Sequence, residues 1–137
     1  MFALAVASCS NSVNVQPPAT EPEVASVCAD LIDALPATVE EQTARDTEPA
    51  SNLTAAWGSS PIVLRCGVAE PTAFEPTSQL TSVNGVDWFP EPRDDGYVFT
   101  TWGRTVRIEV TVPSEYAPEA SPLVDLATAI KATIPKI

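Results

Sequence analysis

The sequence predicts an α+β domain, a two-layer sandwich in which a mostly antiparallel sheet carries two helices on one face. Apolar residues recur at helical spacing in one stretch near the start of the chain and in another at its end. Between these stretches lie short runs of β-branched and aromatic residues, separated by glycine, asparagine and proline. A chain of 137 residues is long enough for one core, so we expect a single domain over residues 21–137.

The first helix is expected between Thr20 and Pro36. Thr20 and Glu23 have the spacing of a capping box, and apolar side chains follow at positions 24, 27, 28, 31, 32 and 35. Pro36 ends the helix because the residue before a proline avoids the helical conformation. The polar and acidic stretch 37–51 that follows is predicted to be a solvated loop.

The run from Pro61 to Val68 is predicted to be the central strand, because it is short, apolar and bounded by turn residues. Strict alternation places Ile62, Leu64 and Cys66 on one face and Arg65 on the other. We expect Cys66 to face the helix that carries Cys28, which directs Arg65 away from the helices.

A proline-punctuated loop is expected over residues 69–79, followed by a short hairpin within residues 80–88. Asn84-Gly85 lies in the middle of that segment and is a strong signal for a two-residue hairpin turn. The sequence therefore predicts two short antiparallel strands there.

A second hairpin is predicted between strands at 97–102 and 105–112. Gly103-Arg104 would connect them in a type II′ turn, which favours glycine at its first central position. The alternation in both strands places Trp102 and Arg107 on the face away from the helices.

The last helix is expected to begin at Ser121-Pro122, an N-cap and first-turn pair. Apolar residues at 123, 126, 127, 130 and 134 form its buried stripe, and Pro135 ends it. With both helices on the same face, the opposite face of the sheet is left for a partner.

The first nine residues resemble the end of an export signal, since an apolar run is followed by small residues. The stretch from Val6 to Cys9 is similar to the bacterial lipobox, in which the cysteine is lipid-modified. We therefore expect export to the outer side of the cell membrane with a lipid anchor on Cys9. The alternative is a secreted protein cleaved nearby, with Cys9 incidental. Residues 10–20, polar and rich in proline, are predicted to be a flexible tether.

Three cysteines in an exported chain leave one unpaired. Lipidation of Cys9 removes the odd one and leaves Cys28 and Cys66 to form a disulfide. A nucleophilic role for Cys66 lacks the usual base, because the chain contains no histidine.

Five segments together resemble a known family: Ala55–Gly58, Pro61–Val68, Val83–Trp88, Thr101–Pro113 and Leu126–Ile130. They are similar to domain-of-unknown-function family 3515, found in actinobacterial secreted proteins and lipoproteins. The resemblance covers roughly residues 24–135, nearly a whole domain. It implies an envelope location and paired cysteines, and it carries no activity.

Composition excludes several classes of function. With 18 acidic and 7 basic residues the formal charge is −11, which disfavours nucleic acid and anionic membrane surfaces, so the lipid anchor is the expected membrane contact. The absence of histidine removes the usual triads and zinc helices. Asp94-Asp95-Gly96 provides too few oxygens for calcium and is predicted to be a turn. We expect no metal site and no cofactor.

The candidate binding residues are Arg65, Trp102, Arg107 and Trp57, an aromatic and cationic group expected on the outer face of an acidic protein. The expected partner is an envelope protein or a cell-wall component. The alternative is that these long side chains only cover the sheet or pair with acidic residues.

A non-catalytic binding module is therefore favoured. The competing hypothesis is an envelope hydrolase that cleaves glycans with carboxylates such as Asp87 and Glu91. Acidic residues in loops beside prolines are usually only solvated, which makes this the weaker hypothesis.

Overall fold

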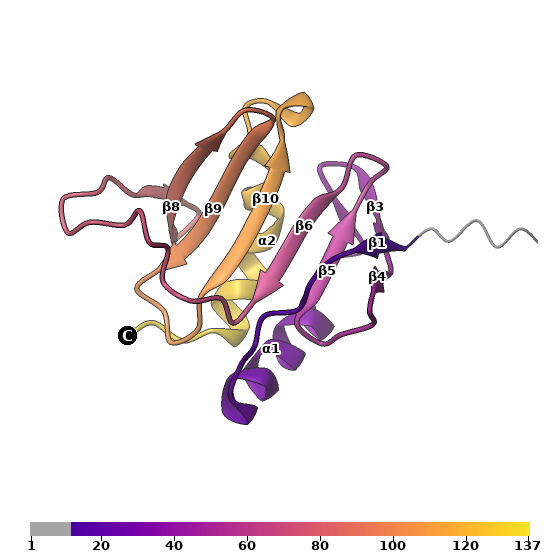
Figure 1. The fold of residues 1–137 in the computed structure, drawn as a ribbon, viewed down its shortest axis with the longest axis horizontal. Helices are drawn as coiled ribbons and strands as arrows, with labels where there is room; N and C mark the ends of the chain where they lie inside the picture. The colour runs from indigo at the N-terminus through magenta and orange to yellow at the C-terminus, as the bar shows by residue number, and fades with distance from the viewer. Residues whose placement is uncertain (1–11) are drawn as a thin grey trace, which may run out of the picture.

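An antiparallel sheet of eight strands forms the centre of the computed structural model, which describes residues 12–137 (Figure 1). Its strands in spatial order are β2 (Thr38–Val39), β3 (Gln42–Arg45), β5 (Thr54–Trp57), β6 (Ile62–Cys66), β10 (Ile108–Pro113), β9 (Gly96–Trp102), β8 (Val86–Arg93) and β7 (Thr81–Val83). A separate parallel pair consists of β1 (Val13–Asn14) and β4 (Thr47–Glu48). The predicted signal segment, the lipobox and Cys9 lie outside the described residues.

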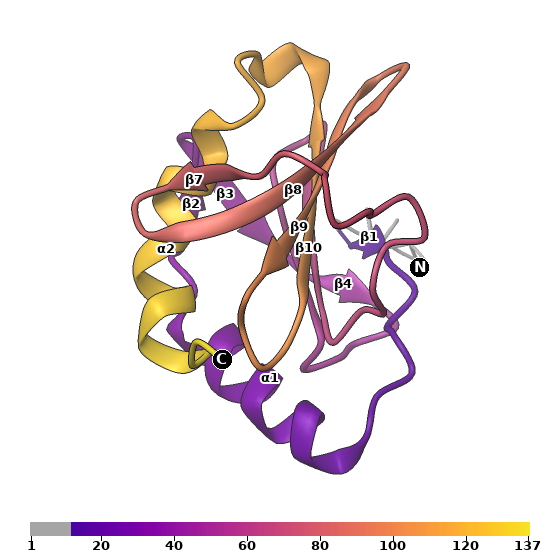
Figure 2. The same ribbon diagram turned by 90° about the vertical axis from the view of Figure 1, so that its left-hand side faces the viewer.

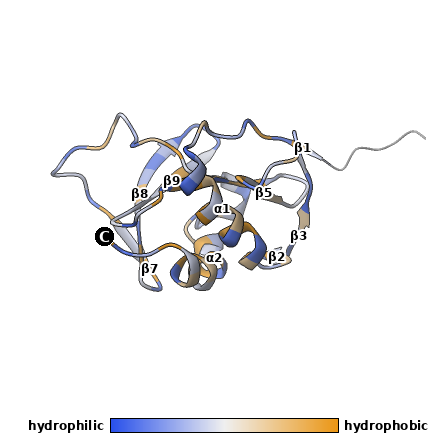
Figure 3. Cartoon of the chain, turned by 90° about the horizontal axis from the view of Figure 1, so that it is seen from below, coloured by the Kyte–Doolittle hydropathy of each residue, from blue (hydrophilic) through white to orange (hydrophobic). Residues whose placement is uncertain are grey.

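Two helices, α1 (Pro22–Ala34) and α2 (Ser121–Thr133), cover one face of the sheet (Figures 2 and 3). They bury Leu31 of α1 and Leu126 and Ile130 of α2 in the core that lies between the layers. The predicted α+β two-layer sandwich is confirmed. Neither helix is long and apolar enough to cross a membrane, within the part of the chain that the structure describes.

The start of α1 differs from the predicted capping box. Glu21 is the N-cap and makes no side-chain cap, and Pro22 occupies the first turn, where its fixed φ suits a helix. Thr20 instead packs its methyl group over Gly67, where an added Cβ would collide with it. Gly67 also has a positive φ of 93°, so both the close contact and the backbone conformation require glycine at this position.

The central strand is where predicted, and it is bonded to the helix layer. Cys66, at the end of β6, forms a disulfide with Cys28 of α1, with a Cα–Cα distance of 5.7 Å. The bridge spans 38 residues of sequence, for which the chain-entropy estimate is about 4 kcal/mol. That is a large part of the stability expected of a domain this size.

The stretch 37–51, predicted to be a loop, contains β2, β3 and β4, so that prediction is wrong. Val39 is fully buried, and the β2–β3 turn places Glu40 and Glu41 at positive φ. The acidic residues that suggested a loop occupy the turn and the edge of the sheet. Backbone pairing of β3 with β5 holds this segment in a regular strand conformation.

The predicted tether does not hang free over the residues that the structure describes. The N–H of Val13 donates to the carbonyl of Asp46 at 2.8 Å, and the N–H of Val15 donates to that of Glu48 at 3.1 Å. Val15 is only 6% exposed. Backbone pairing with β4 and one buried valine therefore hold residues 13–15 in the fold in spite of their polar, proline-containing context.

The β7–β8 hairpin confirms the turn at Asn84-Gly85, whose φ angles are 49° and 85°. Strand β8 continues further than predicted, through Pro90 and Pro92 to Arg93. With two-residue turns at both of its ends, β8 directs these prolines to the edge beyond β7. Neither ring nitrogen has a hydrogen to donate there, so the open edge is protected against another strand.

The prediction of a two-residue turn at Gly103-Arg104 is wrong, because β9 ends at Trp102 and β10 begins only at Ile108. The side chain of Arg104 is buried, with 7% of the residue exposed. Its guanidinium donates to the carbonyl of Ile134 at 2.6 Å and to that of Gly85 at 3.1 Å. Two backbone acceptors therefore lengthen the connection, one of them at the C-terminal end of α2.

Two buried tryptophans provide a matched test of the packing. The indole N–H of Trp57 donates to the carbonyl of Pro36 at 3.1 Å, whereas that of Trp88 has no partner among the described residues. Both Trp57→Phe and Trp88→Phe remove the same volume, but only the first breaks a hydrogen bond. We expect Trp57→Phe to lower the free energy of unfolding by about 1 kcal/mol more than Trp88→Phe does, measured by urea unfolding. Equal losses would contradict the assigned bond.

Candidate functional site

The outer face of the main sheet, opposite the helices, is partly covered at both ends (Figure 2). At one end β1 and β4 lie over β5, where the hydroxyls of Thr47 and Thr54 are 2.6 Å apart. At the other end the 69–79 loop lies against β8 and β9 through Phe74. The strand register places these residues on the outer face: Val63, Arg65, Asp87, Glu91, Val98, Trp102, Glu109 and Thr111.

An aromatic cluster with one cation lies at the β8–β9 end of this face. Phe74 stacks on Trp102 with ring centroids 3.6 Å apart, and Phe89 meets Phe74 edge-on at 5.3 Å. The guanidinium carbon of Arg107 lies 5.2 Å from the Trp102 ring centroid, within the range of a cation–π contact. We call these four residues the Trp102 cluster. The sequence predicted Trp102 and Arg107 on this face and missed both phenylalanines.

Arg65 lies on the outer face as predicted, and it already has partners. Its Nε donates to the carbonyl of Gln16 at 3.0 Å, and its Nη1 lies 3.0 Å from a carboxylate oxygen of Glu109. The side chain is about 30% exposed. Arg65 therefore fastens the N-terminal segment to the sheet.

Trp57 does not lie on the outer face, so its predicted place beside Arg65, Trp102 and Arg107 is wrong. It pairs with Ile62 in the β5–β6 register and is 1% exposed in the core beneath the helices. Its indole N–H donates to the carbonyl of Pro36. Trp57 is therefore a packing residue that joins the end of α1 to the sheet.

Asp87 and Glu91 lie on the outer face of the same strand, four residues apart. At about 3.4 Å per residue their Cα atoms are roughly 14 Å apart, whereas the carboxyl groups of glycosidase pairs lie about 5–9.5 Å apart. Glu91 lies 3.4 Å from Arg93, and Asp87 is opposite Trp102 in the register. The strand spacing therefore keeps the backbone positions of the two acids apart, which does not favour the hypothesis of a catalytic pair.

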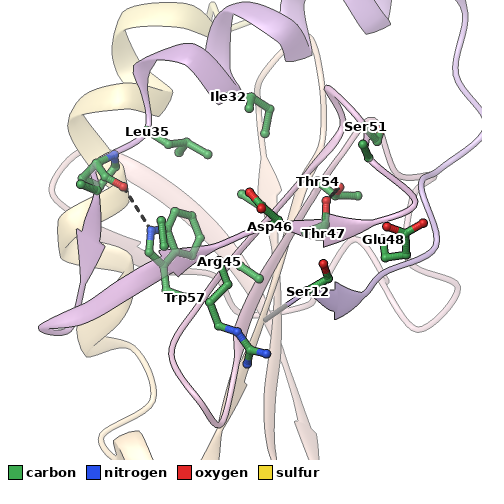
Figure 4. A pocket seen from close by; sticks show the side chains of 16 residues that line it. Ser12, Ile32, Leu35, Arg45, Asp46, Thr47, Glu48, Ser51, Thr54 and Trp57 are labelled. Carbon is green, nitrogen blue, oxygen red and sulfur yellow. Dashed lines mark hydrogen bonds between the residues drawn. The ribbon is translucent and has the colours of Figure 1, made fainter. Parts of the chain in front are cut away.

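A groove of about 550 Å³ lies at the other end of the sheet, below the C-terminal end of α1 (Figure 4). Ile32, Leu35 and Trp57 form its apolar side, and Ser12, Asp46 and Glu48 lie on its polar side. Arg45 reaches along it and donates to the carbonyl of Gly58 at 2.8 Å. No cluster of three or more potential metal ligands occurs among residues 12–137.

Tyr116 has a raised pKa, caused chiefly by burial and secondarily by the charge of Glu115. Its hydroxyl donates to the carbonyl of Ser60 at 2.8 Å. A tyrosine that stays protonated suits this structural bond, which joins the connection before α2 to the start of β6.

The cover on Trp102 can be tested by fluorescence. Trp57 and Trp88 are buried, so acrylamide quenching reports mainly on Trp102. Phe74→Ala should raise that quenching. It should also lower the free energy of unfolding by about 0.5–1.5 kcal/mol, the contribution of a stacked aromatic pair. Leu80→Ala is the control, because Leu80 is exposed near the end of the same loop. Unchanged quenching in Phe74→Ala would show that Phe74 does not cover Trp102.

Comparison with known proteins identifies a family. The chain matches, over residues 2–137, the sequence profile of a family described as "Protein of unknown function (DUF3515)". Neither the comparison with curated proteins nor that with solved structures gave a match. Because the match covers nearly the whole chain, the protein belongs to this family of unknown function, DUF3515.

Proposed function

We propose that this protein is an exported lipoprotein of an actinobacterial cell envelope that binds a protein partner through the Trp102 cluster. The lipobox-like stretch that ends at Cys9 supports the anchor. The Cys28–Cys66 disulfide supports export, since the cytosol keeps most thiols reduced.

The observation that carries the binding role is the placement of Arg107. Among the described residues its guanidinium has no ion pair and no hydrogen bond, and its contact is the face of Trp102. By contrast Arg65 and Arg93 pair with glutamates, and Arg104 is bonded to backbone carbonyls. A half-buried arginine beside a tryptophan is a typical hot-spot arrangement in protein interfaces.

The surroundings of Arg107 favour a protein over a small ligand or a wall polymer. Small molecules bind mostly in concave sites, and the grooves of several hundred Å³ are lined by residues other than Trp102 and Arg107. An anionic wall polymer would be repelled by a formal charge of −11. A protein that presents one acidic side chain to Arg107 and apolar contacts to Trp102 fits this face.

Charge reversal tests the surface. Cross-linking in intact cells, followed by purification and mass spectrometry, should recover a recurrent protein that Arg107→Glu loses. A hot-spot arginine contributes about 2 kcal/mol or more, so the affinity should fall roughly thirtyfold with little change in the thermal midpoint. Arg93→Glu is the matched control, because it makes the same charge change at an exposed position beside the Asp94-Asp95 turn.

Two results would contradict this proposal. A partner retained by Arg107→Glu would remove that residue from the interface. Recovery of wall polymer in place of protein, again lost in Arg107→Glu, would replace the protein by an anionic wall component.

The anchor is tested at Cys9. Mass spectrometry of the wild-type protein should find Cys9 lipidated as the first residue, and Cys9→Ser should remove the lipid-derived mass. Cys28 and Cys66 serve as internal controls, since their disulfide leaves them unmodified. A wild-type protein that carries no lipid on Cys9 would contradict lipid anchoring at this cysteine.

A further inference from the structure

The segment expected to hold the domain away from its anchor is itself part of the fold. Val13 and Val15 hydrogen-bond to the backbone at Asp46 and Glu48, and Val15 is buried. Arg65 fastens the carbonyl of Gln16, and Thr20 packs on Gly67. From Val13 onward the chain is therefore attached to the sheet at successive points.

This attachment leaves very little free length. Cys9 precedes Val13 by four residues, which span at most about 14 Å when fully extended. A free tether over residues 10–20 would instead reach up to roughly 38 Å. A domain anchored at Cys9 must then keep β1 and β4 close to the lipid headgroups.

The Trp102 cluster lies toward the opposite end of the molecule. β4 lies over β5 through the Thr47–Thr54 contact, and Trp102 is the last residue of β9, three positions further along the strand order. Three spacings of about 4.8 Å place β9 roughly 14 Å beyond β5, and Phe74 and the 69–79 loop lie there too. Figure 1 shows β1 and β4 at one end of the long axis and the loop before β7 at the other.

We infer that the anchored domain lies with its β1–β4 end on the membrane surface and presents the Trp102 cluster away from the bilayer. The surface in contact with the membrane includes exposed Asn14, Gln16 and Glu48. The partner then approaches from the side of the cell wall, and contact with a partner segment at the bilayer surface is excluded. This inference rests on the lipid anchor in the proposed function and specifies the position of its binding surface.

The geometry is measurable without depending on lipidation by the cell. Because Cys28 and Cys66 are bonded to each other, Cys9 is the one free thiol of the full chain and can be coupled to a maleimide lipid in phosphatidylcholine vesicles. A donor fluorophore on a bioorthogonal amino acid replaces exposed Asn14 of β1 or exposed Thr77 of the 69–79 loop, with acceptors on the headgroups.

The expected result is roughly twofold more energy transfer from position 14 than from position 77, since β1 lies at the β5 end of the outer face and the 69–79 loop lies at the β8–β9 end. A twelve-residue Gly-Ser insertion after Ser10 should remove most of that difference. Equal transfer from both positions without the insertion would overturn the inference.

Release of the segment gives a second, independent readout. Val15→Asp places a charge at the buried valine and should make transfer from the two positions converge, while Gln16→Glu adds the same charge at an exposed position and should not. A retained difference in Val15→Asp would show that this segment does not set the orientation. Unlipidated Cys9 in cells would refute the proposed anchor, whereas the vesicle result alone decides the geometry.

Discussion

The bond between Cys28 and Cys66 sets the orientation of the central strand, and much of the remaining structure depends on that orientation. It joins α1 to the end of β6, the strand that pairs with β5 on one side and β10 on the other. With Cys66 directed toward the helices, alternation directs Arg65 outward. The bond therefore lies on the same face as the buried Ile62 and Leu64, and the opposite face presents the cation that holds the N-terminal segment.

The predictions that succeeded depend on neighbours in sequence. The alternation in Pro61–Val68, the Asn84-Gly85 turn and the apolar stripes of both helices each contain their own signal, and each is found in the structure. The general fold followed from these local patterns, whereas the Cys28–Cys66 disulfide followed from the count of three cysteines. When one face of a helix or strand is buried, its apolar residues recur with the period of that element, and this period is visible in a single sequence.

The predictions that failed depend on distant partners. Strands β1 to β4 are short and polar, and they are ordered by backbone bonds to segments that composition does not identify. The burial of Trp57 follows from its register opposite Ile62, and the stacking of Phe74 on Trp102 brings a loop back over a strand that follows it in the chain. Neither register nor loop docking has a period, so sequence patterns carry little information about them.

The two arginines in the connection between β9 and β10 differ in environment, and this difference gives them different roles. Arg104 and Arg107 lie three residues apart, yet Arg104 is buried on two backbone carbonyls while Arg107 lies over an aromatic ring at the surface. The partial negative charge at the C-terminal end of α2, near Ile134, favours a cation there, which accounts for burial without a carboxylate partner. Arg107 has no comparable acceptor among the described residues, although the chain carries 18 acidic side chains. An acidic protein that leaves this cation without an ion pair on its outer face keeps the energy of one ion pair available for a partner, which favours Arg107 as the centre of the proposed interface.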